Sequence, residues 1–302
     1  MMAASDPDRP DRPDRPDRKE RWGLEEGDLL APGLHAVRLL GGGERYEAYL
    51  AFDERRRYLV VAKVLRPDQV DDRAALRGMR REAEIVGSLR HPVIMRLFDA
   101  VLDGERPHLV LEHVEGPRLS TLIRRFGSLA VDQAAPLAVE IAAALHYMHA
   151  EGYAHLDVKP SNTIMGAPPR MIDLSIARSI ERAARTDHPI GTDPYMSPEQ
   201  ASGGDVAPIG PPADVWGLGV TLYEAVTGSM PFPEPSDDDP FPQLRLEPAP
   251  LGRDIPGPIA EALGASLAFD PADRPTADEL ATIVEPLLAR PRRVILTALK
   301  PR

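Results

Sequence analysis

The chain has 302 residues, of which 43% are hydrophobic and 27% are charged, a length that allows about one to three domains. Its net charge of −11 argues against broad electrostatic binding to nucleic acid or to anionic lipid, because both need a basic surface. The absence of cysteine excludes disulfides, thiolate chemistry and Cys-based zinc sites.

The N-terminal segment is a low-complexity repeat of Asp-Arg-Pro. Because proline removes backbone donors and charges of both signs stay solvated, residues 1–24 are predicted to form a disordered arm. No apolar run approaches the roughly 18 residues that span a bilayer, and the N-terminus lacks the apolar core of a signal peptide. We therefore expect a cytoplasmic protein without a membrane span.

Residues 34–65 predict antiparallel strands. Short apolar runs in this stretch are separated by a glycine cluster and by a charged segment, as expected for tight connections between strands. Two more strands are expected around a Gly-containing turn within residues 94–114. The apolar runs of the first stretch cover residues 35–40, 45–53 and 57–65.

Most of the remaining pattern is helical. Apolar residues recur at helical spacing between Arg73 and Leu89, which predicts a first helix. A loop-rich stretch with short strands is expected over residues 153–198. Further helices are predicted at residues 133–152, 213–227 and 277–289. The fold class is therefore α+β, with a small β-rich lobe, a larger helical lobe and a ligand site expected at the seam near residues 112–116.

The strongest chemical signal is the segment HLDVKPSNTIM, residues 155–165. Phosphoryl transfer to a hydroxyl needs a carboxylate that orients and deprotonates the nucleophile, a cation near the moving group and an oxygen ligand for Mg²⁺. Asp157, Lys159 and Asn162 meet these needs. Asp173 follows an apolar strand and supplies a second carboxylate for the metal, although Asp in that place is usually only a turn residue.

A second set of residues suits the phosphates of a nucleotide. Gly41 and Gly43 would let the backbone of a strand–turn–strand hairpin approach phosphate oxygens, although such glycines more often form only a turn. Lys63 lies in an otherwise apolar strand, where its charge needs a partner. Glu82 on the next helix is the candidate partner that would orient the ammonium. The alternatives are an edge lysine that reaches water and an ordinary surface glutamate.

Taken together, the motifs resemble the protein kinase superfamily in its bacterial, eukaryotic-like (Hanks-type) serine/threonine branch. The matching markers are LGGG, VVAK, Glu82, LVLEHVEG, HLDVKPSN, DLS, GTDPYMSPEQ, DVWGLG and DRPTADEL. The resemblance implies a bilobal kinase domain over residues 34–290, with an N-lobe at 34–112 and a C-lobe at 117–290. A short C-terminal tail would follow at 291–302.

The resemblance implies ATP-dependent phosphorylation of Ser/Thr residues on proteins, with autophosphorylation, in bacterial signalling. The implied metal is Mg²⁺, with Mn²⁺ as a substitute, held by Asn162 and Asp173. The implied catalytic residues are Asp157, Lys159 and Thr192, and the last two together are typical of Ser/Thr-directed members. The implied nucleotide-binding residues, with the backbone of Glu112 and Val114 bonding the adenine, are Leu40, Gly41, Gly43, Ala48, Ala62, Lys63, Glu82, Leu111, Glu112, Val114 and Ile164.

The resemblance also implies supporting roles away from the reacting atoms. Glu199 should pair with Arg274 in a buried bridge. Asp214 should accept hydrogen bonds from the backbone of the catalytic loop. His155 should belong to an apolar spine between the lobes and act neither as acid nor as base.

Several positions depart from the family's pattern. Tyr46 stands at the third glycine of the phosphate loop, and Ser175 replaces the glycine of the metal-binding triplet. Leu156 replaces an arginine that in much of the family grips a phosphorylated activation-loop residue. We therefore predict that activity does not depend strongly on phosphorylation of Thr186, even though Thr186 follows Arg185 and is the favoured autophosphorylation site.

The departures keep a second function open, that of a catalytically weak (pseudokinase) nucleotide-binding scaffold. A kinase-fold enzyme that acts on a small molecule is a third interpretation. It is disfavoured because GTDPYMSPEQ resembles the surface that holds a peptide substrate. The expected partners are thus ATP and protein substrates with a Ser/Thr acceptor, without nucleic acid.

Overall fold

The computed structural model describes residues 20–252 and 255–288. Most of the predicted arm, residues 1–19, and all of the predicted tail at 291–302 lie outside the described residues.

The chain divides into two compact units. The residues up to Leu76, together with Ala100–Val110, form the first unit. Arg77–Asp99, together with the residues from Leu111 onward, form the second unit. The lobe boundaries predicted from the resemblance remain predictions.

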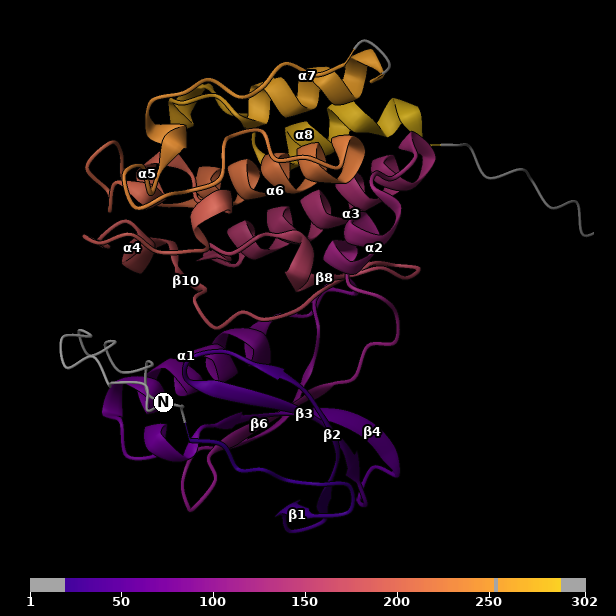
Figure 1. The fold of residues 1–302 in the computed structure, drawn as a ribbon, viewed down its shortest axis with the longest axis vertical. Helices are drawn as coiled ribbons and strands as arrows, with labels where there is room; N and C mark the ends of the chain where they lie inside the picture. Colours follow the sequence, from indigo (N-terminus) through magenta and orange to yellow (C-terminus); the bar gives the residue numbers. More distant parts are fainter. Residues whose placement is uncertain (1–19, 253–254, 289–302) are drawn as a thin grey trace, which may run out of the picture. The chain divides into compact units, whose positions relative to one another are not determined.

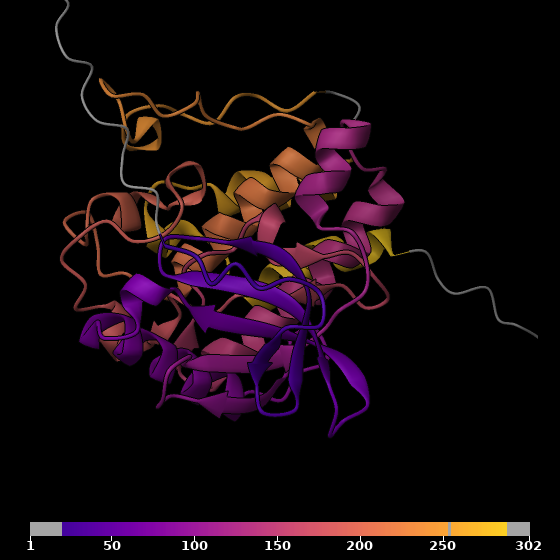
Figure 2. The same cartoon turned by 60° about the horizontal axis from the view of Figure 1, so that its bottom comes forward.

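Within the described residues, a six-stranded sheet has the strand order β1-β2-β3-β4-β6-β5, and its first strands are strongly curled (Figure 2). β2 pairs antiparallel with β3, and β3 pairs antiparallel with β4 from Tyr46 opposite Leu65 to Asp53 opposite Tyr58. These pairings confirm the antiparallel strands predicted over residues 34–65. The strands are β1 Leu29–Ala31, β2 Leu34–Gly42, β3 Tyr46–Asp53, β4 Tyr58–Leu65, β5 Leu97–Val101 and β6 His108–Glu112.

Buried side chains alternate along β3, which is half-buried on one face and fully buried on the other over its first residues. Glu47 and Tyr49 lie on the buried face, whereas Tyr46 and Ala48 lie on the half-buried face. This alternation follows from the two-residue period of a strand. The two faces of β3 therefore carry different residues: Ala48, which is implied to bind the nucleotide, lies on one face, and Glu47 and Tyr49 lie on the other.

The second unit is mainly helical (Figure 1). Helix α3 packs against α6 and α8, and α7 packs against the same two helices. Helix α6 ends at Gly228, which adopts a left-handed conformation with φ of 74°, as predicted for a glycine C-cap. The helices are α1 Arg73–Ser88, α2 Leu119–Phe126, α3 Val131–Ala150, α4 Ile180–Ala183, α5 Pro198–Ala201, α6 Pro211–Thr227, α7 Gly257–Ser266 and α8 Ala277–Val284.

Two helical predictions need correction. Helix α7 was not predicted. Pro256 precedes it and Pro258 lies in its first turn, and proline is typical of loops, although it is well tolerated in the first turn of a helix. The last helix ends at Val284 instead of residue 289, and a 3-10 turn over Glu285–Leu287 follows. Pro286 explains this early end, since proline in a helix interior removes a backbone hydrogen bond.

Two short strand pairs in the second unit organise the loops around the candidate site. β7 (Tyr153–Ala154) pairs with β10 (Arg178–Ser179), and β8 (Thr163–Ile164) pairs with β9 (Arg170–Met171).

A β-rich N-terminal part and a helical C-terminal part confirm the predicted α+β fold class. None of the helices within the described residues has both the length and the apolar character that crossing a bilayer requires.

Candidate active site

The carboxylate of Asp157 is the centre of a cluster of polar side chains in the second unit. Thr192 donates a hydrogen bond of 2.6 Å from Oγ1 to Oδ1 of Asp157. Lys159 Nζ lies 2.7 Å from Oδ2, and Asn162 Nδ2 donates to the same oxygen over 2.9 Å. Lys159 also donates to Thr192 Oγ1 over 2.5 Å. The structure thus brings together the four residues that the sequence assigned to catalysis and metal binding around this loop.

The backbone of the catalytic loop is held by one buried carboxylate. Asp214, at the start of α6, accepts hydrogen bonds from the backbone N–H groups of His155 and Leu156 over 2.8 and 2.6 Å. His149 Nε2 lies 2.8 Å from the same carboxylate. These contacts confirm the role predicted for Asp214, and they anchor the residues immediately before Asp157.

Leu156 adopts a left-handed backbone conformation with φ of 66°, which is unfavourable for a residue with a branched apolar side chain. The surrounding structure compensates for this strain. Asp214 accepts from the N–H of Leu156, and Gln200 Nε2 donates to its carbonyl oxygen over 2.8 Å. Gln200 was not singled out from the sequence. The only local signal for it is its place three residues after Ser197, where it closes a capping box.

Histidine 155 is almost fully buried, and its Nδ1 accepts a hydrogen bond from the N–H of Asp157 over 3.2 Å. A buried imidazole bonded to its own loop is structural, in agreement with the role expected for it. The apolar spine to which it was assigned stays a prediction.

The two candidate metal ligands lie at the same end of one hairpin. Asn162 directly precedes β8 and Asp173 follows β9, and the N–H of Ile172 donates to the carbonyl of Asn162 over 2.8 Å. Asp173 has a left-handed conformation with φ of 65°, and its Oδ1 accepts from the N–H of Ser175 over 3.3 Å. Ser175 itself is absent from the residues with positive φ. Within the triplet Asp173-Leu174-Ser175 the left-handed conformation thus lies at Asp173.

A carboxylate and an amide oxygen are ligands that suit Mg²⁺, which keeps several waters and binds substrate phosphates. Asn162 uses its Nδ2 to bond Asp157, so its Oδ1 is the atom suited to a cation. Within residues 20–252 and 255–288, no group of three or more His, Asp or Glu side chains could hold a metal on its own. One carboxylate and one amide oxygen leave most positions around such an ion to waters and phosphate oxygens, which fits the preference of Mg²⁺.

The activation segment is packed through apolar contacts around Leu156. Leu156 is 3% exposed and belongs to one buried cluster with Ala154, Ala183, Ile190, Ile209 and Ala213. Gln200 bridges the carbonyl oxygens of Leu156 and Ile190, each over 2.8 Å. The position that carries an arginine in much of the family is thus an apolar anchor here.

Thr186, the favoured autophosphorylation site, is only 6% exposed. Its hydroxyl accepts a hydrogen bond of 2.7 Å from Arg178 Nη1. Burial, followed by the charges of Arg81 and Arg182, lowers the pKa of Arg178 below its ordinary value. In this conformation the hydroxyl of Thr186 is buried and bonded to the guanidinium of Arg178. This arrangement disfavours Thr186 as a phosphate acceptor.

The predicted bridge between Glu199 and Arg274 is confirmed. Two parallel hydrogen bonds of 2.7 and 2.9 Å join the guanidinium to the carboxylate, and both side chains are fully buried. The guanidinium also lies over the ring of Trp216, 4.9 Å from its centroid. The remaining donors of Arg274 bond the carbonyl oxygens of Pro212, Ala268 and Phe269.

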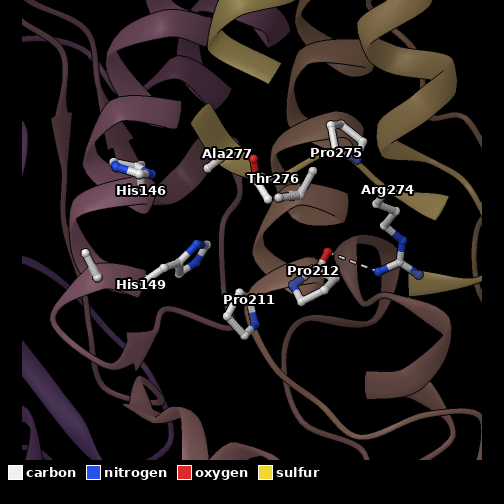
Figure 3. A pocket seen from close by; sticks show the side chains of 10 residues that line it. His146, His149, Pro211, Pro212, Arg274, Pro275, Thr276 and Ala277 are labelled. Carbon is white, nitrogen blue, oxygen red and sulfur yellow. Dashed lines mark hydrogen bonds between the residues drawn. The ribbon is translucent and has the colours of Figure 1, made fainter. Parts of the chain in front are cut away.

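A cavity of about 250 Å³ lies beside this bridge (Figure 3). His146 and His149 of α3 line one side, and Pro211, Pro212 and Arg274 line the other. His149 also contacts Asp214. The residues that line this cavity include none of the predicted catalytic, nucleotide-binding or metal-binding residues.

Leu111 and Glu112, two of the residues implied to bind the nucleotide, belong to the second unit. Leu111 is buried, and the N–H of Glu112 donates to the carbonyl of Arg96 over 2.9 Å. The backbone N–H of Glu112 is therefore already bonded, and the hydrogen bond predicted between its backbone and adenine would use its carbonyl oxygen. Just beyond, Gly116 has φ of 136°, and a Cβ there would lie 2.4 Å from Met165 O and 3.1 Å from Ile164.

The phosphate-loop residues belong to the first unit. Gly41 has φ of 152°, a conformation open to glycine but not to side-chain residues. Ala48 pairs with Lys63 across β3 and β4, with Ala62 next to it. Lys63 Nζ lies 4.8 Å from the ring centroid of Tyr46, a cation–π contact with the residue that replaces the third glycine.

Lys63 is 9% exposed and Glu82, on α1, is fully buried. Lys63 belongs to the first unit and Glu82 to the second, so their ion pair stays a prediction. The nucleotide-binding roles implied for Ala48, Ala62 and Ile164 also draw on both units and stay predictions, as do the roles of Leu40 and Val114.

Comparisons with known proteins agree with this geometry. The family model described as "Protein kinase domain" matches residues 34–283. The chain is 35% identical over 230 residues to the serine/threonine-protein kinase PkaA of Streptomyces coelicolor, which covers 74% of this chain and 42% of PkaA. It is 36% identical over 203 residues to PknB of Mycobacterium leprae, covering 64% of this chain and 32% of that protein.

A third relative is the serine/threonine-protein kinase PknA of Mycobacterium tuberculosis, at 32% identity over 261 residues, which cover 82% of this chain and 60% of PknA. The chain thus spans between about a third and three fifths of the length of these relatives. The match to the family model covers most of the chain, and the chain belongs to the protein kinase family.

Proposed function

We propose that this protein transfers the γ-phosphoryl group of ATP to serine and threonine hydroxyls of protein substrates, as part of bacterial signalling, and that it also phosphorylates itself. The observation that carries the proposal is the arrangement of Lys159 and Thr192 around the carboxylate of Asp157. In the family named above, nucleotide and divalent metal are shared features, and we propose Mg²⁺ as the metal.

In this mechanism Asp157 orients the acceptor hydroxyl and takes its proton. Its side chain is 10% exposed. Lys159 places a positive charge beside the same carboxylate, where it would offset the charge that develops on the moving phosphoryl oxygens. Thr192 fixes the direction of Asp157 through Oδ1.

The other residues bind and orient the nucleotide. Asn162 and Asp173 would hold the metal, which when bound supplies charge neutralisation of the phosphate oxygens. Gly41 and Gly43 would let the backbone of the hairpin approach the phosphates without a side chain in the way, and Lys63, oriented by Glu82, would bind them directly. The adenine would be bonded by the backbone of Glu112 and Val114, behind which Leu111 is the gatekeeper. It would stack between Ala48, Ala62 and Ile164, with Leu40 at the edge of the site.

The deciding experiment measures transfer of label from γ-labelled ATP in the presence of Mg²⁺. The wild type is compared with Asp157→Asn, and Asp205→Asn, a change of the same kind at an exposed loop position, is the matched control. We expect transfer by the wild type and by Asp205→Asn and a loss of several orders of magnitude in Asp157→Asn.

The result also separates the second candidate function, the nucleotide-binding scaffold. The departures at Tyr46, Leu156 and Ser175 favour it. Tight ATP binding by the wild type without any transfer would support the scaffold and overturn the kinase.

A further inference from the structure

The glycine-rich hairpin between β2 and β3 is gripped by the first residue after β4. Arg66 Nε donates to the carbonyl of Gly43 over 2.8 Å, and the N–H of Arg66 donates to the carbonyl of Arg45 over 3.0 Å. Inside the hairpin, the N–H of Gly43 donates to the carbonyl of Tyr46 over 3.0 Å. One residue therefore bonds the backbone on both sides of the turn.

The neighbouring Gly42 shows how close this grip is. A Cβ on Gly42 would lie 2.7 Å from Tyr46 O, 3.2 Å from Arg66 Nη2 and 3.3 Å from Glu47 Cα. No real side chain fits those distances without a shift of the backbone or the guanidinium. Gly42 was not assigned a role from the sequence. The close packing against Tyr46, Arg66 and Glu47 explains why glycine is needed at this position.

Arg66 is held in place by a buried carboxylate. Its side chain is 6% exposed, and Nη1 lies 3.1 Å from Oε1 of Glu47, which is 1% exposed. The other oxygen of Glu47 accepts from the hydroxyl of Tyr49 over 2.7 Å and from the N–H of Trp22 over 3.3 Å. A buried ion pair persists only when its remaining polar atoms are satisfied, and Glu47 meets this condition on both oxygens.

Trp22 extends this network to the N-terminal segment. Its indole Nε1 donates to the carbonyl of Leu65 over 2.7 Å, and its ring lies under the guanidinium of Arg106, 4.7 Å from the ring centroid. Arg66 Nη1 also donates to the carbonyl of Glu20 over 3.2 Å. The segment before β1 is thus bonded to both partners of the ion pair and to the residue that precedes Arg66.

The network lies behind the hairpin. Glu47 and Tyr49 occupy the buried face of β3, whereas Ala48, which faces the other way, pairs with Lys63. Glu47 thus lies on the face of β3 opposite to Ala48, the residue proposed to contact the adenine, and Arg66 and Trp22 bond Glu47. The three residues act through the backbone of the glycine-rich turn.

We propose that Arg66 is a positioning residue that fixes the glycine-rich hairpin for ATP, and that Glu47 and Trp22 set the position of Arg66. We call these three residues the Arg66 clamp. The inference rests on the proposed role of Gly41 and Gly43 in binding ATP. It makes ATP affinity depend on a segment, residues 20–24, that precedes the part of the chain matched by the kinase family model.

Arg66→Lys and Trp22→Phe test the clamp without removing bulk. Lysine keeps a positive charge opposite Glu47. It has no counterpart of the Nε–H group, so the hydrogen bond to the carbonyl of Gly43 is lost. Phenylalanine keeps a ring under Arg106 but loses the hydrogen bond to Leu65. The matched control is Arg56→Lys, since Arg56 pairs with Asp53 over 2.5 Å at the other end of β3, in the turn between β3 and β4.

The measurements are KM for ATP, KM for an acceptor peptide, kcat at saturating ATP, and the dissociation constant of a fluorescent ATP analogue. For Arg66→Lys we expect KM for ATP and the dissociation constant to rise about tenfold, as for the loss of one charge-assisted hydrogen bond. Trp22→Phe should show a smaller rise in the same direction. The peptide KM and kcat should stay near wild type, as should all values for Arg56→Lys.

A folded Arg66→Lys protein with unchanged ATP affinity overturns the inference, as does an equal effect from Arg56→Lys. If the wild type binds nucleotide but transfers no phosphoryl group, the proposed function fails while the dissociation constants still test the clamp. If Arg66→Lys unfolds, Trp22→Phe decides: a raised dissociation constant supports the clamp and an unchanged one overturns it.

Discussion

The hydroxyl of Thr192 donates a hydrogen bond of 2.6 Å to Oδ1 of Asp157. In the same cluster Lys159 bonds the oxygen of that hydroxyl and pairs with the other carboxylate oxygen. The activation segment and the catalytic loop are therefore joined at the proposed base itself, and the position of one depends on the other.

This bond predicts that Thr192→Val lowers kcat by about 10- to 100-fold, the range expected for the loss of one hydrogen bond to a charged group. Valine matches the shape of threonine but cannot orient the carboxylate. Thr192→Ser keeps the hydroxyl and should retain most of the rate. Steady-state kinetics with an acceptor peptide would check this, and equal losses in the two variants would show that the hydroxyl is not what matters.

The bridge between Glu199 and Arg274 predicts a large effect on stability. Glu199→Gln leaves the buried guanidinium without its counter-charge, and we expect the free energy of unfolding to fall by about 3–5 kcal/mol. The matched control is Glu181→Gln, because Glu181 pairs with Arg185 over 2.6 Å while both side chains are 76% exposed. Exposed pairs contribute about 0–1 kcal/mol. Urea unfolding would measure the free energy of unfolding of both variants. Similar decreases in Glu199→Gln and Glu181→Gln would contradict a stabilising role of the buried bridge.

Phosphorylation of Thr186 is predicted to matter little, since Leu156 has replaced the arginine that would grip its phosphate. Thr186→Ala should keep the rate close to wild type and reduce stability by about 1 kcal/mol through the lost bond to Arg178. Thr186→Ser is the control. A loss of rate of more than about tenfold in Thr186→Ala alone would indicate that Arg178, near Arg81 and Arg182, forms a latch without the loop arginine.

Tyr49 predicts an alkaline limit to the stability of the first unit. Burial, and then the hydrogen bond and the charge of Glu47, raise the pKa of Tyr49 from 10.0 to about 12, against smaller opposing effects of Leu24 and Arg21. Since the folded-state pKa is the higher one, the unfolded chain loses this proton first as pH rises. The stabilisation is complete below about pH 10 and is lost progressively up to about pH 12.

In Tyr49→Phe this loss is absent, so stability should fall less steeply between about pH 10 and 12, although the variant is less stable at neutral pH. Tyr58→Phe is the control, because Tyr58 is 53% exposed. Thermal unfolding across that range would measure the slope, and identical slopes in wild type and Tyr49→Phe would rule out the role of Tyr49.

The features that could be predicted from the sequence are those set by residues close together in the chain. Asp157, Lys159 and Asn162 lie within one short loop, so their spacing alone placed them together. The helix predicted from Arg73 to Leu89 agrees with α1 within one residue, because its apolar period is regular. Gly228 ended α6 as expected, since glycine adopts the left-handed conformation at low energy.

The contacts that it could not predict join distant residues. Glu47 and Arg66 are 19 positions apart. They meet because β3 pairs with β4 in one register and because the side chain of Glu47 lies on the buried face of β3. Thr192 is 35 positions from Asp157 and was assigned by the family resemblance alone. The strand β1 was missed because three residues carry too little pattern, and its pairing with β2 includes a bulge.

The most direct test of the central claim is transfer of labelled phosphoryl groups to four peptides that differ only in the acceptor residue, which is Ser, Thr, Tyr or Ala. The wild type should label the Ser and Thr peptides and neither of the others, and Asp157→Asn should label none. Label on the Tyr peptide, or equal labelling by wild type and Asp157→Asn, would contradict a serine/threonine kinase whose base is Asp157.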